Sequence, residues 1–319
     1  MALKTDYKDY IPPSGGRKYK ITANSDGSSS VEDITQYQQV GDTWGAEDIN
    51  QVNKLVNGAV YPNLGTNTNF SNPINQRGAA SYTTATEAHM YCIDRWRILK
   101  NTTYTVASFT LTATSYAARA CGMWQSNEMG AHQLSIGDDV TVSIYANGKL
   151  HTPTMKVIDR DLYDAFANVP ASYDCDDFEI VLCTYAGDNT MYNLGIYPKK
   201  PLTVNYIKWE KGSVATPYVP KGYGAELAEC LRYFQRVHAD WRIYPTLKDM
   251  LYRFSQSTLQ VMRIKPTISA HGTPYTFGCT INALDAQPMA FTVETKITEQ
   301  GQNSAAASML GYFDLSADL

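Results

Sequence analysis

Two tryptophans stand in polar stretches of the sequence, where a core residue is not expected. Trp124 is followed by Gln125 and Asn127, and Trp241 lies between an aspartate and an arginine with Tyr244 close by. Sugar rings have apolar faces that stack on aromatic side chains, and amide groups can hydrogen-bond their hydroxyls. We therefore expect these residues to bind a saccharide. The alternative is that each tryptophan is half-buried at a contact between subunits.

Carboxylates form the second group of residues that could carry chemistry, and they cluster along the chain. The clusters are Asp138 with Asp139, Asp159 with Asp161, and Asp174 with Asp176 and Asp177. Aspartates commonly cap and turn the loops between strands, and we favour this interpretation. Loop carboxylates could also hold a structural calcium ion, and a facing pair could cleave a glycosidic bond.

Other catalytic and metal-binding signatures are absent from the sequence. The histidines are isolated, no glycine loop for phosphate occurs, and no cysteines are paired at zinc-site spacing. The scattered cysteines are therefore predicted to be free thiols, mostly buried. The stretch Asp94-Arg95-Trp96-Arg97 mixes charges with a predicted strand, and an Asp–Arg ion pair explains it better than catalysis. We expect a protein that is not an enzyme and needs no cofactor.

Composition and charge argue against several classes of protein. The 319 residues include 27 Lys and Arg against 31 Asp and Glu, so the formal net charge is −4 and nucleic acid is not an expected partner. No apolar run approaches the ~20 residues of a membrane-spanning helix, and the first residues lack a signal-peptide pattern. We expect synthesis in a cytoplasm and no membrane insertion.

Hydrophobic patterning predicts a small N-terminal module over residues 1–65. A turn signal at residues 24–27 indicates a hairpin, and acidic residues open a predicted helix over about 45–60. Apolar residues of this helix follow the spacing of a coiled-coil seam and are the predicted oligomer contacts, with packing inside the module as the alternative. These residues are Ile49, Val52, Val56 and Ala59.

The middle of the chain, residues 66–221, is predicted to form a β-sandwich with a jelly-roll topology. Apolar and polar residues alternate over 107–111, 140–144 and 178–182, as they do in strands with one buried face. Residues 202–209 are apolar on both faces, as expected of a central strand.

The last part, residues 222–319, is predicted to begin with a helix over about 225–237 and to continue as a small β-sandwich. Predicted strands lie around 258–264, 289–295 and 309–315. The expected fold class is therefore mainly β in all three domains.

Several short stretches along the chain form a recognisable pattern. They are Met1–Asp9, Asn24–Gly27, Gly45–Asn50, Phe70–Gly78, Tyr91–Trp96, Trp209–Tyr218, Glu226–Phe234 and Gly311–Leu319. The first three resemble the N-termini of tail-fibre proteins from phages of gut Firmicutes. The next three resemble a carbohydrate-binding-module-like jelly roll of phage tails. The last two are similar to the link and the tip domain that follow it.

This resemblance implies a receptor-binding protein of the virion tail, usually a homotrimer. Its N-terminus would attach to the phage tail or baseplate, and its outer domains would bind glycan on the bacterial surface. Arg77, Asp94 and Trp96 match positions that define the fold. Two other classes remain open, namely a purely structural tail or baseplate joint and a glycan depolymerase. The near-neutral charge suits a neutral glycan, because its recognition gains little from long-range steering.

Overall fold

A computed structural model of the chain describes residues 11, 13–38, 49, 52, 63–84, 89–243, 248–298 and 307–317. The chain divides into two compact units, Met1–Tyr61 and Pro62–Leu319. Antiparallel strands dominate the described residues, so the expectation of a mainly β protein is confirmed. None of the helices in the described part of the chain is long and apolar enough to cross a membrane.

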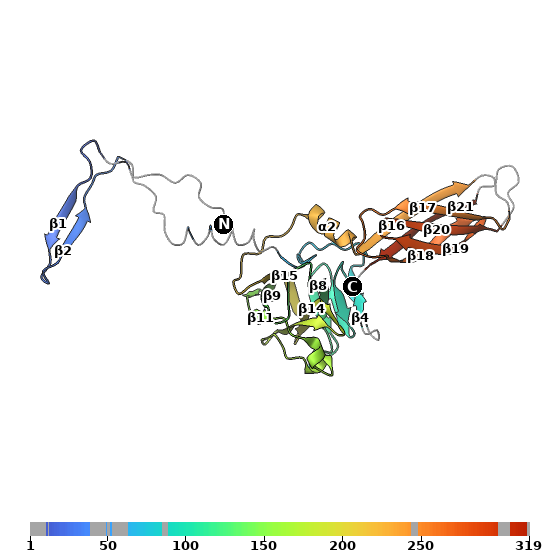
Figure 1. Cartoon of the computed structure of the whole chain (residues 1–319), viewed down its shortest axis with the longest axis horizontal. Helices are drawn as coiled ribbons and strands as arrows, with labels where there is room; N and C mark the ends of the chain where they lie inside the picture. The colour runs from blue at the N-terminus through green and yellow to red at the C-terminus, as the bar shows by residue number, and fades with distance from the viewer. Residues whose placement is uncertain are drawn as a thin grey trace. The chain divides into compact units, whose positions relative to one another are not determined.

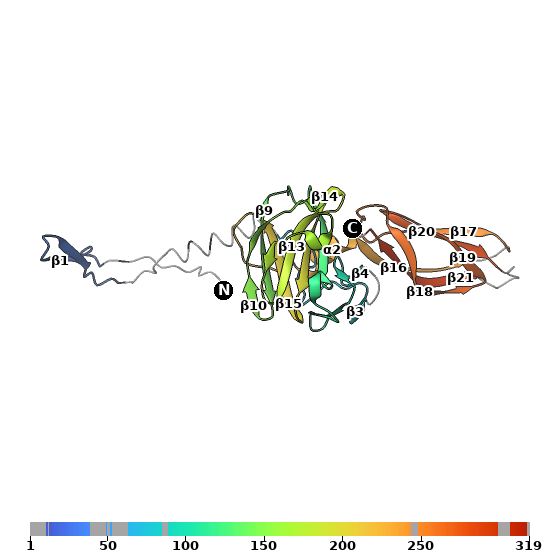
Figure 2. The ribbon, with the colours of Figure 1, turned by 90° about the horizontal axis from the view of Figure 1, so that it is seen from below.

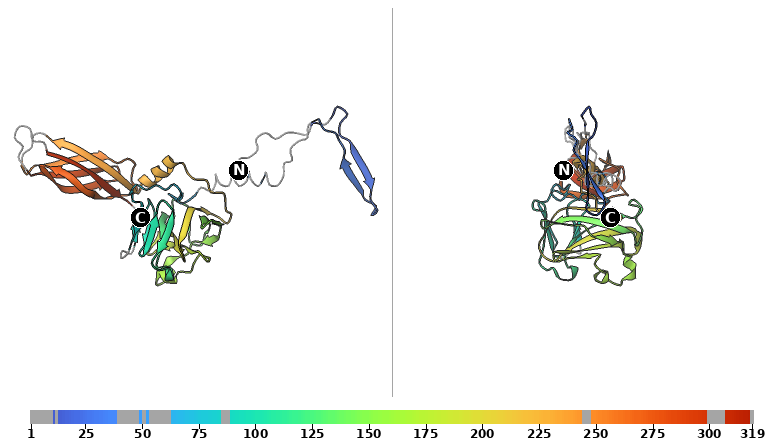
Figure 3. Two further views of the ribbon diagram at one scale, coloured as in Figure 1. Left: turned by 180° about the vertical axis from the view of Figure 1, so that it is seen from behind. Right: turned by 90° about the vertical axis from the view of Figure 1, so that its left-hand side faces the viewer.

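The Met1–Tyr61 unit contains an antiparallel hairpin of β1 (Tyr19–Ala23) and β2 (Ser29–Asp33), drawn in blue in Figures 1 and 3. The predicted turn joins them, with Gly27 at a φ of 85° and the Asp26 carboxylate accepting from the Ser28 amide at 2.9 Å. Every residue of both strands is exposed. Ile49 and Val52 are helical, whereas Val56 and Ala59 lie outside the described residues.

The Pro62–Leu319 unit begins with a β-sandwich of two antiparallel sheets. The first sheet consists, in spatial order, of β10 (Lys149–His151), β9 (Asp139–Ala146), β15 (Leu202–Lys211), β7 (Thr110–Ala113), β6 (Thr102–Thr105) and β3 (Ser81–Thr83), with β11 (Thr154–Lys156) also paired to β9. The β9–β10 turn is the Asn147-Gly148 pair, and both residues have positive φ, as this hairpin turn requires.

The second sheet carries the candidate site. It consists, in spatial order, of β12 (Tyr173–Asp174), β13 (Phe178–Tyr185), β14 (Asp188–Pro198), β8 (Met123–Glu128), β5 (Arg97–Leu99) and β4 (His89–Tyr91). Three short 3-10 helices lie in the connections of the sandwich, η1 (Ala117–Arg119), η2 (Arg160–Leu162) and η3 (Phe166–Asn168).

The two sheets enclose one apolar core, and the strands of both are visible in Figure 2. Trp96 and Trp209 lie at its centre without solvent exposure, with their rings edge to face at 6.2 Å. Their indole N–H groups donate to the Asn67 carbonyl at 2.8 Å and to the Tyr192 hydroxyl at 2.9 Å. The predicted apolar faces of β9 and β13 point into this core, which confirms a β-sandwich in the middle of the chain.

The chain then forms a helix and a second, smaller sandwich. Helix α2 (Tyr223–Leu231) leads into one sheet of β16 (Phe234–Ile243), β21 (Ala307–Ser316) and β18 (Thr267–Phe277), and into another of β17 (Leu251–Ser257), β20 (Ala290–Ile297) and β19 (Cys279–Gln287). These strands are coloured orange to red in Figure 1. Phe291, Val293, Met309, Phe313 and Leu315 are buried between the two sheets, as their alternation predicts.

Three predicted elements differ from the structure. The helix predicted over 225–237 ends at Leu231, because Val237, Ala239 and Trp241 follow the period of a strand and pair with β21. The strand predicted over 258–264 is irregular, and only Met262 of its apolar residues is buried. The strand predicted over 107–111 begins only at Thr110, because residues 106–109 form the β6–β7 turn.

The charged and sulfur-containing residues singled out above have structural roles. Asp94 is fully buried and forms an ion pair with Arg77 at 3.0 Å. Its partner is therefore Arg77, which is 17 residues away in sequence, and not the adjacent Arg95 or Arg97. All six cysteines are free and five are buried, as predicted. Burial raises the pKa of the Cys183 thiol to about 11, which keeps that thiol protonated at neutral pH.

Candidate functional site

The outer face of the second sheet, turned away from the sandwich core, contains a groove that is open to solvent. Its cavity volume of about 430 Å³ lies in the range of small-molecule sites. Strands β5, β8, β13 and β14 form its floor, and the segment that carries η2 and η3 borders it. We call it the Trp124 groove. Its lining residues are His89, Arg97, Trp124, Arg160, Phe166, Cys183, Thr184, Tyr185, Ala186, Asn193 and Tyr197.

Trp124 occupies the middle of this sheet face. It lies between Arg97 of β5 and Gly195 of β14 in the strand register, and its ring is 5.7 Å from that of His89. The side chain is partly exposed, unlike the core tryptophans. Its Nε1 atom is buried and has no hydrogen-bond partner among the described residues. Trp124 therefore offers both an apolar ring face and an unused donor.

Two further aromatic residues form one side of the groove. Tyr197 of β14 is buried, and its ring lies 5.6 Å from that of Phe166 in η3. A side chain at Gly195 would meet the Tyr197 hydroxyl at 2.5 Å, so this glycine makes room for the ring. Burial raises the pKa of Tyr197 well above its usual value, which keeps its hydroxyl protonated.

Polar groups complete the lining. The Arg97 guanidinium donates to the Tyr91 hydroxyl at 2.5 Å and lies over the Tyr91 ring, 4.4 Å from its centroid. The Asn193 side-chain oxygen Oδ1 accepts from the Ser126 hydroxyl at 2.6 Å, which orients the side-chain amide on the sheet. Arg160 of η2 donates to the Tyr163 carbonyl. The groove thus combines a stacking surface with oriented donors, as saccharide sites do.

Gln125 and Asn127, expected beside Trp124, do not reach this groove. Successive residues of a strand point to opposite faces, so both side chains of β8 point inward. Gln125 is fully buried, and its amide exchanges hydrogen bonds with the backbone of Thr66 at 3.1 and 2.6 Å. Asn127 is 3% exposed, and Arg95 donates to its side-chain oxygen Oδ1 at 3.4 Å. Both side-chain amides therefore hydrogen-bond to protein groups on the inner face of the sheet.

Trp241 lies elsewhere, in β16 of the smaller sandwich. Its ring stacks on Phe254 of β17 with centroids 4.0 Å apart and an interplanar angle of 7°. It packs against the apolar core between the two sheets. Tyr244, its expected companion, lies outside the described residues. The structure therefore separates the two tryptophans, and Trp124 lines a groove that also carries amide and guanidinium groups.

The aspartate clusters occupy turns and ion pairs. Asp159 caps η2 by accepting from the Asp161 amide at 3.0 Å, and Asp161 accepts from the Gly187 amide at 3.0 Å. The other clusters include lysine pairs, which are Asp138–Lys211, Asp139–Lys156, Asp174–Lys199 and Asp177–Lys200. Within the described part of the chain, no group of three His, Cys, Asp or Glu side chains is placed to hold a metal ion.

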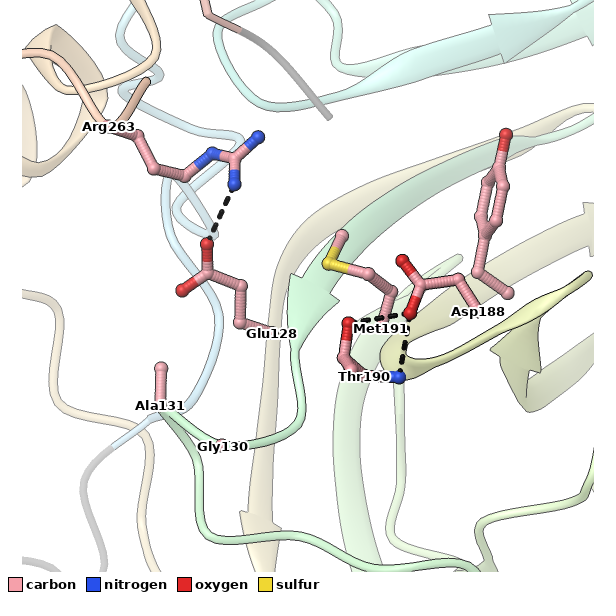
Figure 4. Close-up of a pocket in the computed structure, with 8 residues that line it drawn as sticks. Glu128, Gly130, Ala131, Asp188, Thr190, Met191 and Arg263 are labelled. Atoms are coloured by element: carbon pink, nitrogen blue, oxygen red, sulfur yellow. Dashed lines mark hydrogen bonds and ion pairs between the residues drawn. The ribbon is translucent and has the colours of Figure 1, made fainter. Parts of the chain in front are cut away.

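A second cavity of about 540 Å³ adjoins the Trp124 groove, and Tyr185 lines both. Figure 4 shows its two carboxylates, each already engaged by the protein. Glu128 pairs with Arg263 at 3.0 Å, and Asp188 accepts from the Thr190 amide at 2.8 Å and from the Thr190 hydroxyl. These hydrogen bonds lower the pKa of Asp188, which suits a turn cap better than an acid that must hold a proton.

Several lining residues were not predicted from the sequence. Tyr197 and Asn193 alternate along β14 with the core residues Leu194 and Ile196, and this alternation could have identified their face. Arg160 and Phe166 belong to short 3-10 turns, and no local pattern indicates that this segment covers the sheet. Comparison of the chain with protein-family models, with curated proteins and with solved structures gives no match.

Proposed function

We propose that this protein is a noncatalytic receptor-binding protein of a phage tail that binds host surface glycan in the Trp124 groove. One observation carries the binding role. A partly exposed tryptophan lies in a groove of about 430 Å³ that is also lined by Tyr197, Arg97 and Asn193. The phage assignment rests on the sequence resemblance described above. With it come attachment through the N-terminal module, a homotrimer and the jelly-roll topology of the sandwich.

The test is retention of the labelled full chain on whole cells and purified wall glycan of candidate gut Firmicutes. We expect saturable retention of the wild type and loss of retention in the Trp124→Ala variant. The matched control is Trp241→Phe, which keeps an aromatic ring on Phe254 and is expected to bind as the wild type does. Unchanged retention of Trp124→Ala would contradict the proposal.

Thermal unfolding and polymer length complete the experiment. Trp124 belongs to none of the buried core clusters, so its removal should cost little stability, whereas Trp209→Ala should cost about 3–5 kcal/mol. A large loss for Trp124→Ala would make it a packing residue. Shortened glycan in the eluate would identify a depolymerase, and absence of retention from the whole panel would favour a structural joint.

A further inference from the structure

The Trp124 groove has a local charge that differs from that of the whole chain. The chain carries a formal net charge of −4, yet the described residues that line the groove include two arginines, Arg97 and Arg160, and no aspartate or glutamate. Among these described residues, a ligand in the groove meets two guanidinium groups and no carboxylate. This local charge bears on the class of glycan that fits.

Neither guanidinium forms an ion pair with a carboxylate of the described residues. Arg97 is oriented by Tyr91, through the hydrogen bond and the stacking contact, and its buried Nε atom has no hydrogen-bond partner among the described residues. The Arg160 backbone amide donates to the Thr184 hydroxyl at 2.9 Å, and its guanidinium donates to the Tyr163 carbonyl. The tyrosine hydroxyl and the carbonyl are neutral acceptors, so they orient the arginines and leave their charge uncompensated.

Two other arginines of this part of the chain form ion pairs. Arg119, near the same sheet face, pairs with Glu179 at 2.8 Å, and Arg263 pairs with Glu128 at 3.0 Å. The acids closest in sequence to Arg160 are Asp159 and Asp161, and both accept from backbone amides at 3.0 Å. Unlike these two arginines, Arg97 and Arg160 have only neutral partners among the described residues.

We infer that the Trp124 groove binds an acidic glycan, whose carboxylate or phosphate groups are recognised by Arg97 and Arg160 while a sugar ring stacks on Trp124. This inference rests on the proposed glycan-binding function and specifies its ligand class. Guanidinium groups form strong, charge-assisted hydrogen bonds with both kinds of anion, and their planar shape matches both. A neutral glycan would leave these two charges without a partner in the bound state.

The test is a glycan array on which each acidic member is printed beside its neutral parent. Polygalacturonate is paired with its methyl ester, and poly(glycerol phosphate) with polyglycerol, so the carboxylate and phosphate sources are read separately. We expect the full chain to bind acidic members at least about tenfold more tightly than their parents, with binding that weakens as salt rises. The Arg97→Gln/Arg160→Gln variant should lose this preference.

Two control variants keep the test decisive. Arg253→Gln/Lys265→Gln removes the same charge from the smaller sandwich and should leave the preference intact. Arg97→Lys retains the charge and shows whether a loss reflects charge or misfolding, with thermal unfolding measured for each variant. Equal binding of acidic glycans and neutral parents, lost only in Trp124→Ala, would overturn the acidic ligand and leave the proposed function standing. Binding of no glycan would overturn both.

Discussion

Lys208 and Glu210 are a buried ion pair in a strand that the sequence presents as apolar. Their charged atoms are 3.1 Å apart, and their side chains are 3% and 1% exposed. Thr216 donates to Glu210 from its amide at 2.8 Å and from its hydroxyl at 2.6 Å. All three residues lie in or beside the stretch Trp209–Tyr218, so this part of the resemblance marks a structural element of the sandwich.

We predict that Lys208→Met destabilises the protein by about 3–5 kcal/mol, because it leaves a buried carboxylate without its cation. The double variant Lys208→Met/Glu210→Gln should cost less, since no uncompensated charge remains. Urea denaturation of the single and double variants measures both values. The control is Lys156→Met, which breaks an exposed pair with Asp139 and should cost about 0–1 kcal/mol. A double variant as unstable as the single one would contradict the coupling.

At the residue scale, the sequence predicts a shared site for Trp124, Gln125 and Asn127, and the structure places only Trp124 of these three in the groove. The tryptophan was recognisable because a polar context is unusual for a core residue. Gln125 and Asn127 share that context, but the pleat of β8 turns them to the inner face, where backbone and arginine partners satisfy their amides. Only the strand assignment, which the sequence did not supply for residues 123–128, separates the two faces.

Gly195 determines the shape of the groove at the scale of the strands. In β14 a Cβ atom at this position would lie 2.5 Å from the Tyr197 hydroxyl and 2.7 Å from Cε2 of the same ring. We predict that Gly195→Ala displaces Tyr197, costs about 1–3 kcal/mol and weakens glycan retention. Thermal unfolding and retention are measured together.

The matched control for this substitution is Gly130→Ala. No atom lies within 4 Å of a Cβ atom built there, so the change in stability should stay within about 0.5 kcal/mol. If Gly195→Ala is as stable as the control and retains glycan, Tyr197 does not need the space that the glycine provides, and this account of the groove fails.

The strands with clean alternation were predictable, and the segments that close the site were not. Strands β9, β13 and β21 show regular apolar periods, and their inward residues are buried as expected. The 3-10 turns at 160–168 and the irregular stretch 258–266 lack a period. Contacts with residues distant in sequence hold the stretch 258–266. For example, the side-chain oxygen Oε1 of Gln235 accepts from the Leu259 backbone amide at 2.7 Å. Propensity cannot encode such a contact.

At the scale of the Pro62–Leu319 unit, one histidine links the core to pH. The Tyr192 hydroxyl accepts from Trp209 at 2.9 Å and shares a hydrogen bond of 2.6 Å with Nδ1 of His132. When the hydroxyl donates this second bond, Nδ1 must carry no proton. Burial, followed by the nearby Arg95 charge, lowers the pKa of His132 to about 4.

We predict that acid weakens the fold through this histidine. The unfolded chain binds its proton near pH 6.5 and the folded chain only near pH 4, so this contribution is complete above pH 6.5 and is lost as the pH falls towards 4. The loss should be about 2 kcal/mol, allowing for partial exposure of the ring. Urea denaturation between pH 4 and 7 should show a flatter profile for His132→Gln, and parallel profiles would contradict the prediction. Burial raises the pKa of Glu226, so this residue favours the folded state as the pH falls. Its contribution is the same in the wild type and in His132→Gln and does not affect the comparison.

The proposed homotrimer can be tested at the scale of the whole molecule. Ile49 is helical and 46% exposed in one chain, and Val52 continues the predicted seam three residues later. We predict that the full chain has a native mass about three times its 35.5 kDa, measured by light scattering after gel filtration.

Ile49→Asp/Val52→Asp should release single chains that are retained less on cells, because three linked sites bind with higher avidity than one. Ile21→Asp changes an apolar side chain that is 70% exposed in β1 and should leave the mass unchanged. A wild-type mass of a single chain would contradict the homotrimer. A trimer that survives the Ile49/Val52 substitution would locate the subunit contacts outside this seam.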